Sequence, residues 1–324
     1  MQRCQHTEEE LLRQNMERCY FQCRKSAVHQ DGLEERLHDI SLERPVSRSE
    51  SIILRARVGT YPRLRKLTLR LRQSRISSQD LRRGGCNLSK SIPICWGVRK
   101  EGRTLWTRNA VKGKSVRGER RKRDGKIEWR RWDPTKSKVA AALLRTSSEP
   151  SSILPSPGST CLYLGASSGG TVSHIHDFVC GAENHHGGQV VAVEISPRMS
   201  RDLISLSESR PGMVPVLGDA RKSRVIAPFI RSKADWIHQD LSIADQAETF
   251  VKMAMNFLIP GGVGLLSLKA ASERSSEGDD KARFHNAEII LKNSELSLLE
   301  RIELRGLEEQ HVLFVCELSL CGDN

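Results

Sequence analysis

From about residue 160, the chain alternates between short apolar runs and segments whose apolar residues recur at the spacing of one helix face. The apolar runs predict strands at 160–164, 189–194, 213–217, 234–239, 262–269, 296–304 and 311–318. Helices are predicted between them from apolar residues three or four positions apart, such as Val172, Ile175, Phe178 and Val179, or Ala247, Phe250, Val251 and Ala254. Five strand–helix alternations followed by two adjacent strands predict an α/β fold, with a mostly parallel seven-stranded sheet and a terminal antiparallel hairpin.

Local signals add further boundaries. Residues 136–145 are predicted to form a helix, and the Ser-, Pro- and Gly-rich stretch 146–160 a loop. Ser196 followed by Pro197 predicts a helix start, because the serine hydroxyl can cap the first turn and proline lacks an amide hydrogen that this turn would leave unbonded.

A different pattern precedes the alternating part. Runs of β-branched and aromatic residues, separated by Glu101-Gly102 and Asp124-Gly125, predict a small antiparallel β unit. We therefore assign residues 89–131 to a small β-rich domain and residues 132–324 to the α/β domain. Residues 1–88 have no sustained periodicity and few aromatics, which predicts a basic extension that is disordered or loosely helical.

The positive charge is concentrated near the amino terminus. Residues 1–140 contain 35 lysines and arginines against 16 acids, whereas residues 141–324 contain 17 against 23, within a net charge of +13. Such an excess predicts a polyanionic partner, RNA or DNA, because contacts to phosphates need no sequence code. The alternative is a solvated segment that only aids solubility.

Cysteine usage and hydropathy argue against a disulfide-rich protein, a zinc-finger protein and a membrane protein. Nine scattered cysteines, with no signal peptide, predict reduced intracellular thiols rather than a disulfide framework. Cys19 and Cys23 are not followed by a second Cys or His pair at zinc-finger spacing, so no metal site is predicted. No apolar run approaches the roughly 20 residues that span a bilayer, so no membrane association is predicted.

A glycine loop and two acids predict a nucleotide-containing cofactor. The loop from Gly165 to Gly170 joins the first α/β strand to a helix that Thr171 opens, so backbone and a helix N-terminus can approach the cofactor closely. Glu194 ends the second strand, where a carboxylate can accept both ribose hydroxyls. Asp219 follows the third strand, where a carboxylate can accept the adenine amine. This is the βαβ layout of adenosine-cofactor sites.

Two further charged residues predict chemistry at the same edge of the sheet. Asp240 follows the fourth predicted strand and Lys269 ends the fifth, at the carboxyl ends where an open α/β sheet forms its ligand crevice. A lysine in a partly buried cleft can accept a proton from a hydroxyl, and a nearby carboxylate can orient the reacting groups.

The glycine loop also permits a second interpretation. Gly165-Ala-Ser-Ser-Gly169 has the spacing of a nucleophile elbow, and Ser167, Asp240 and His311 occur in the order of a hydrolase triad. The elbow, however, ends the first strand of the predicted sheet, and the hydrolase would leave the acids of the next two strands unexplained. We therefore favour the cofactor site and keep the α/β-hydrolase as an alternative.

Taken together, these residues and their neighbours resemble the fibrillarin family in its shorter archaeal form. Members of this family are 2′-O-methyltransferases for ribosomal and transfer RNA. The resemblance covers about residues 90–318 and rests on seven segments: Arg131-Trp-Asp-Pro-Thr-Lys-Ser-Lys-Val-Ala-Ala-Ala, Leu162-Tyr-Leu-Gly-Ala-Ser-Ser-Gly-Gly-Thr-Val-Ser-His, Val191-Ala-Val-Glu-Ile-Ser-Pro-Arg, Leu217-Gly-Asp-Ala-Arg-Lys, Gln239-Asp, Asp245-Gln-Ala-Glu and Leu268-Lys-Ala. It implies the Rossmann-like fold of class I S-adenosylmethionine-dependent methyltransferases.

The loop analysis and the resemblance together assign the site. The residues expected to contact S-adenosylmethionine are Gly165, Gly170, Thr171, Glu194, Ile195, Asp219, Ala220, Asp240, Leu241, Ser242 and Ile243. The catalytic set that the resemblance implies is Lys138, Asp240, Lys269 and His311. In the implied reaction a methyl passes to a ribose hydroxyl while Lys269 takes up or stabilises the departing proton.

The chain departs from the family pattern at three places. Gly169-Gly170-Thr171 replaces Gly-Thr-Thr, which removes one hydroxyl. Ile243 stands where the family's Asp-Val-Ala-Gln-Pro-Asp-Gln has its first glutamine, and Gln310 replaces the aspartate that precedes the terminal histidine.

The resemblance also implies partners. Since every nucleotide has a ribose, target choice must come from elsewhere, and the family uses a box C/D guide RNA, a Nop-family scaffold protein and a kink-turn-binding ribosomal-type protein. Ribosomal and transfer RNA are the expected substrates, with a cytoplasmic location for an archaeal protein and a nucleolar one for a eukaryotic protein. A non-catalytic RNA-binding subunit is the alternative, although it would not need Lys138, Asp240 and Lys269.

Overall fold

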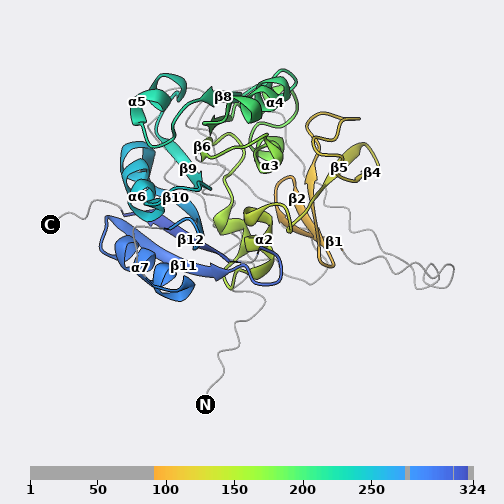
Figure 1. Ribbon diagram of the computed structural model, residues 1–324. Helices are drawn as coiled ribbons and strands as arrows, with labels where there is room; N and C mark the ends of the chain where they lie inside the picture. The colour runs from red at the N-terminus through yellow and green to blue at the C-terminus, as the bar shows by residue number, and fades with distance from the viewer. Residues whose placement is uncertain (1–90, 274–277, 309, 320–324) are drawn as a thin grey trace, which may run out of the picture. The chain divides into compact units, whose positions relative to one another are not determined.

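A seven-stranded sheet carries the fold, with the strand order β11-β12-β10-β9-β6-β7-β8 (Figure 1). The computed structural model describes residues 91–273, 278–308 and 310–319. The strands of this sheet are β6 (Thr160–Leu164), β7 (Gln189–Glu194), β8 (Met213–Leu217), β9 (Ala234–Gln239), β10 (Leu258–Lys269), β11 (Leu296–Glu303) and β12 (His311–Leu318). Strands β10, β9, β6, β7 and β8 are parallel, whereas β12 runs antiparallel between β10 and β11. The predicted parallel sheet with a terminal antiparallel hairpin is confirmed.

Helices cover both faces of the sheet. They are α2 (Lys138–Arg145), α3 (Gly170–Val179), α4 (Pro197–Ser207), α5 (Ser223–Ile226), α6 (Gln246–Phe257) and α7 (Asp280–Lys292), with short 3-10 turns η2 (Pro150–Ile153), η3 (Ala182–Asn184) and η4 (Ala227–Phe229). Alternate residues of each strand point to opposite faces. In β6, Cys161 and Tyr163 pack with α2, α3 and α4, whereas Leu162 and Leu164 pack with α5, α6 and α7.

A second, five-stranded antiparallel sheet precedes the α/β part, in the order β1-β2-β3-β5-β4. Its strands are β1 (Ser91–Cys95), β2 (Val98–Glu101), β3 (Thr104–Arg108), β4 (Arg121–Asp124) and β5 (Ile127–Trp132). The two predicted glycine turns connect β2 to β3 and β4 to β5, and both Gly102 and Gly125 have positive φ. Trp132 of this sheet packs on Phe178 of α3, which joins the two sheets through one apolar core.

Several predicted boundaries need correction. The first helix begins at Lys138 rather than residue 136, because the Ser137 hydroxyl accepts a hydrogen bond from the Ala140 amide and so caps it. Strand β10 begins at Leu258, four residues before the predicted start, and its register shifts between Leu258 and Val263. The cap predicted at Ser196 is confirmed, since its side chain accepts from the Met199 amide.

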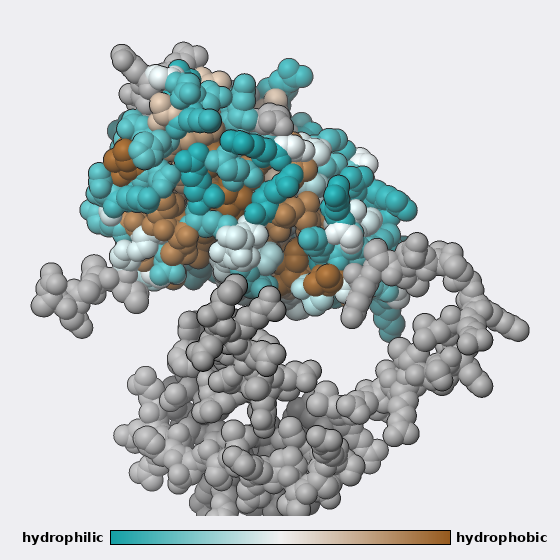
Figure 2. All heavy atoms as spheres, turned by 90° about the horizontal axis from the view of Figure 1, so that it is seen from below, coloured by the Kyte–Doolittle hydropathy of each residue, from teal (hydrophilic) through white to brown (hydrophobic). Residues whose placement is uncertain are grey.

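Other predictions fall outside the described residues, or are tested only within them. The basic extension at 1–88 and the pair Cys19 and Cys23 lie outside the described range. Within that range no group of three or more metal-ligating side chains occurs, and all four cysteines are free. No helix of the described part is long and apolar enough to cross a membrane. On the face drawn in Figure 2, apolar side chains form separate patches among hydrophilic ones.

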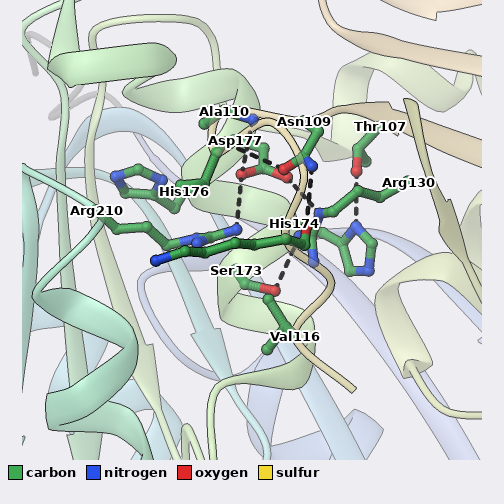
Figure 3. Close-up of polar contacts among 12 residues, drawn as sticks. Thr107, Asn109, Ala110, Val116, Arg130, Ser173, His174, His176, Asp177 and Arg210 are labelled. Atoms are coloured by element: carbon green, nitrogen blue, oxygen red, sulfur yellow. Dashed lines mark hydrogen bonds and ion pairs between the residues drawn. The ribbon is translucent and has the colours of Figure 1, made fainter. Parts of the chain in front are cut away.

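A buried ion network fixes the five-stranded sheet against α3 (Figure 3). Asp177 accepts hydrogen bonds from Arg130 Nε of β5 at 2.8 Å and from Arg210 Nη2 at 3.3 Å, and the side chains of all three residues are at most 1% exposed. Arg130 also donates to Glu119 and to Ser173, which lies one helical turn before Asp177. Since buried guanidinium groups need partners, this cluster specifies how the two sheets meet.

Candidate active site

A cleft of about 420 Å³ opens at the carboxyl ends of β6, β7, β8 and β9. It is lined by Gly165, Ser167, Val193, Glu194, Ile195, Gly218, Asp219, Ala220, Arg221, Asp240, Leu241, Ser242 and Ile243. Such a volume suits a small-molecule ligand of cofactor size. Nine of these residues are among those predicted to contact the cofactor, whereas Ser167, Val193, Gly218 and Arg221 are not.

Two glycines of the loop next to the cleft, Gly165 and Gly169, have no room for a side chain. Gly165 has φ +86°, and a Cβ at that position would collide with the Asp240 carbonyl oxygen at the end of β9. Gly169 caps α3 with φ +87°, and a Cβ there would collide with Leu206 of α4. Only glycine combines the left-handed conformation with this close approach.

Glu194 supports the loop as well as lining the cleft. Its Oε2 accepts a hydrogen bond from the Ser167 amide at 2.7 Å, and its Oε1 accepts one from the Ser196 amide at 2.8 Å. The residue is 9% exposed. Because each carboxylate oxygen has two lone pairs, both oxygens keep capacity to accept hydroxyl donors from a ligand.

Asp219 lines the cleft after β8 and pairs with a basic residue, Arg221, that was not among the predicted site residues. Arg221 Nε and Nη2 donate to the two carboxylate oxygens of Asp219 at 3.0 and 2.9 Å. These hydrogen bonds and the charge of Arg221 hold the pKa of Asp219 below its usual value, so the carboxylate is ionised at neutral pH. An adenine amine would share this carboxylate with Arg221.

Lys138 and Asp240 form an ion pair beside the cleft. Lys138, the first residue of α2, places Nζ 2.9 Å from Asp240 Oδ2, although 102 positions separate the two residues in sequence. Both side chains remain partly exposed, at 19% and 29%. Beneath them, burial lowers the pKa of His238 to about 4, so its imidazole is neutral at pH 7 and shares a hydrogen bond with Ser267.

Lys269 and His311 lie opposite each other in the antiparallel pair of β10 and β12. They are direct register partners at the ends of β10 and β12, and β10 lies next to β9, which Asp240 follows. The structure therefore gathers the four predicted catalytic residues at one edge of the sheet. Gln310, which precedes His311, has φ +59°.

Gln246 fixes the main chain of Lys269, a role that the sequence analysis did not predict. Its Nε2 donates to the Lys269 carbonyl oxygen and its Oε1 accepts from the Lys269 amide, both at 3.1 Å. Gln246 is fully buried, and its own amide donates to Glu273. The available signal was a glutamine that opens a predicted amphipathic helix shortly after a site strand.

Gly170 and Thr171, two predicted cofactor residues, begin α3 but do not line the cleft. The Thr171 hydroxyl instead donates to Ser137 Oγ at 3.1 Å, and Trp132 Nε1 donates to the same oxygen at 3.0 Å. Ser137 therefore joins β5, α2 and α3 immediately before Lys138.

The hydrolase alternative is wrong. Ser167 has the positive φ typical of an elbow, but it follows β6, whereas His311 begins β12. Strands β9 and β10 lie between these two strands, which puts them roughly 14 Å apart at ordinary strand spacing. A serine nucleophile needs its base within hydrogen-bond reach, so this arrangement cannot form a triad.

The profile of one protein family, described as Fibrillarin, matches residues 90–320. The chain belongs to the fibrillarin family. It is 35% identical over 210 residues to the fibrillarin-like rRNA/tRNA 2′-O-methyltransferase of Methanocaldococcus jannaschii, a match that covers 64% of this chain and 86% of the relative.

Two solved structures of fibrillarins share the fold. The Aeropyrum pernix fibrillarin with natively bound S-adenosyl-L-methionine has a TM-score of 0.58 and 30% identity, covering 68% of this chain and 92% of that chain. A fibrillarin solved in complex with Nop5p has a TM-score of 0.57 and 28% identity, covering 66% and 94%. The predicted family and the class I methyltransferase fold are confirmed.

Proposed function

We propose that this chain is an S-adenosylmethionine-dependent methyltransferase that modifies the ribose 2′-hydroxyl of ribosomal and transfer RNA. The observation that carries this proposal is the Lys138–Asp240 ion pair, which lies beside a cleft bounded by Glu194 and Asp219. A protein that only binds RNA would have no need of a charged pair beside a cofactor-sized cleft. The names of the fibrillarin relatives support the same activity.

The cleft fits S-adenosylmethionine by its donor set and its shape. The Glu194 carboxylate can accept ribose hydroxyls and Asp219 can accept an amine, while the bare backbone at Gly165 leaves room for close approach. Ile195 is 63% exposed, which provides an apolar surface for a purine ring. When bound, the cofactor supplies an electrophilic methyl on a sulfonium.

The remaining charged residues act on the methyl donor and on the hydroxyl that receives the methyl. Asp240, held by Lys138, provides a fixed negative charge near the positive donor group. Lys269 Nζ accepts the proton that leaves the 2′-oxygen as the methyl bonds to it, and Gln246 keeps the Lys269 backbone in place. His311, its register partner, adds a titratable group at the same edge.

Transfer of a labelled methyl to a target RNA tests this proposal. The chain is assembled with a box C/D guide RNA and a Nop-family scaffold protein, and label in the RNA is mapped by resistance to alkaline hydrolysis, which requires a free 2′-hydroxyl. Label at one guide-directed ribose is the expected result. An assembled particle that transfers no label would instead support the non-catalytic subunit.

Glu194→Gln is expected to weaken S-adenosylmethionine binding. The change keeps the side-chain shape but removes the charge that strengthens hydrogen bonds to ribose hydroxyls, a loss on the order of 1.5–3 kcal/mol. It also leaves one of the two backbone amides at Ser167 and Ser196 without its acceptor. Titration calorimetry measures the change, with Glu208→Gln on the exposed end of α4 as the control. Equal affinities for Glu194→Gln and the original chain would remove Glu194 from the cofactor site.

Gln246→Met is expected to slow methyl transfer by roughly 10- to 100-fold, because the Lys269 main chain loses both side-chain hydrogen bonds and Lys269 Nζ shifts away from the reacting oxygen. Single-turnover rates measure the effect, while cofactor affinity should be unchanged. Gln189→Met is a matched control, since Gln189 makes two similar bonds to backbone at the opposite end of β7. If both variants slow the reaction equally, Gln246 has only a structural role.

The proposed activity also implies partners and a cellular location. The solved fibrillarin–Nop5p complex supports a Nop-family scaffold as a partner. A box C/D guide RNA and a kink-turn-binding protein would complete the particle, because a ribose-binding site cannot select a sequence. We propose a cytoplasmic location if the protein is archaeal and a nucleolar one if it is eukaryotic.

A further inference from the structure

A second hollow lies on the other side of the glycine loop from the cofactor cleft. It measures about 340 Å³ and is lined by Lys114, Ser115, Val116, Arg117, Ser168, Asp202, Ser205, Leu206, Ser209 and Arg210. Ser167 lines the cleft and Ser168 lines the hollow, so one loop borders both. Three of the lining side chains are cationic and one, Asp202, is anionic.

Arg210 gives the hollow a buried cation with unused donors. The residue is 1% exposed, and its Nη2 donates to Asp177 at a long 3.3 Å (Figure 3). Its Nε has no hydrogen-bond partner among the described residues. Asp177 is already shared with Arg130 and the Ala110 amide. A guanidinium has five donors in a planar fork, so Arg210 can still bind an anion from the hollow.

The loop that presents Lys114 and Arg117 is held in place before any ligand arrives. Glu119 accepts hydrogen bonds from the Val116 and Arg117 amides at 2.9 and 2.7 Å. The Lys114 carbonyl oxygen accepts one from Asn109 at 3.0 Å. A preorganised loop lowers the entropic cost of binding. Arg117 pairs only loosely with Asp202, at 3.7 Å between partly exposed groups, so its charge is available to a stronger anion.

We propose that this hollow binds a backbone phosphate of RNA, with Lys114, Arg117 and Arg210 as its cationic ligands. The inference rests on the proposed function for the identity of the polyanion. A continuous basic run supports a polymer over a free anion, because residues 112–123 contain seven lysines and arginines and the single acid Glu119, which Arg130 neutralises. Ser168 and Ser205 line the same hollow, and serine hydroxyls suit phosphate oxygens.

RNA binding by the full chain tests the hollow directly. Affinity for a 15-nucleotide single-stranded RNA is measured by fluorescence anisotropy between 50 and 200 mM salt. The variant Lys114→Gln/Arg117→Gln changes two exposed residues, so folding is retained. We expect this variant to bind RNA about tenfold more weakly. The slope of log K against log salt concentration should become shallower by about 1. Asp202→Asn removes the competing carboxylate and should strengthen binding.

The matched control is Lys233→Gln/Lys252→Gln, which removes the same charge from exposed positions outside the hollow. If both double variants lose affinity equally, the attraction is diffuse and the proposal fails. The proposal also fails if the Lys114→Gln/Arg117→Gln variant loses affinity for polyglutamate or inorganic phosphate but keeps its affinity for RNA. Methyl transfer by the original chain is measured separately. If RNA binds through the hollow but no methyl is transferred, only the proposed function is refuted. If methyl is transferred and the hollow variants bind RNA as tightly as the original chain, only the phosphate site is refuted.

Discussion

Lys269→Ala is expected to abolish most methyl transfer while S-adenosylmethionine still binds. Lys269 ends β10 beside Asp240 and does not line the cofactor cleft, so its loss acts on the nucleophile and spares the adenosine contacts. Removing a general base or a charge-stabilising group typically costs ~10²–10⁴ in rate. Single-turnover transfer of labelled methyl in the assembled particle measures the loss, and calorimetry measures cofactor affinity.

Lys252→Ala, on the exposed side of α6, is the matched control for Lys269→Ala because it removes one lysine away from the site. It should transfer methyl at the original rate. Transfer by Lys269→Ala at full rate would show that another group takes the proton, and the family assignment would stand. A loss of both transfer and cofactor binding would place Lys269 in cofactor binding.

Asp177→Asn is expected to destabilise the fold by about 3–5 kcal/mol. The substitution keeps the side-chain size but leaves the guanidinium groups of Arg130 and Arg210 buried without their shared counter-charge. Equilibrium unfolding in urea, followed by tryptophan fluorescence, measures the free energy. Trp132, which packs on α3 at the joint between the sheets, reports on this region.

Asp202→Asn provides the comparison for the buried network. Its carboxylate is 58% exposed and lies 3.7 Å from Arg117, so the loss should be under about 1 kcal/mol. Similar losses for Asp177→Asn and Asp202→Asn would mean that solvent screens the buried cluster, and that apolar packing alone joins the two sheets.

The hydrophobic pattern predicted the order and type of the elements in the α/β part. Short apolar runs predict buried strands and one-sided apolar spacing predicts helices, and the strands predicted at 160–164 and 189–194 match the observed bounds. The carboxyl ends of parallel strands share one edge, so Glu194, Asp219 and Asp240 could be assigned to one site before any coordinates. Helix and strand ends were less certain, because caps such as Ser137 act through a single side chain.

Contacts between distant residues were decided only by the tertiary structure. The pairing of Lys138 with Asp240, the hold of Gln246 on Lys269 and the partnership of Asp219 with Arg221 depend on how α2, α6 and the β8 loop pack, which no periodicity encodes.

The hydrolase was likewise excluded only by the tertiary structure. Motif order along the chain says nothing of lateral distance, and β9 and β10 lie between the strands that carry Ser167 and His311. The sequence by itself determined the family, the element order and the edge of the sheet that carries chemistry, because these follow from residue types at fixed spacing. Packing of the turn between α4 and β8 against α3 brought Arg210 to the second hollow, since that position depends on a buried ion pair with Asp177 of α3.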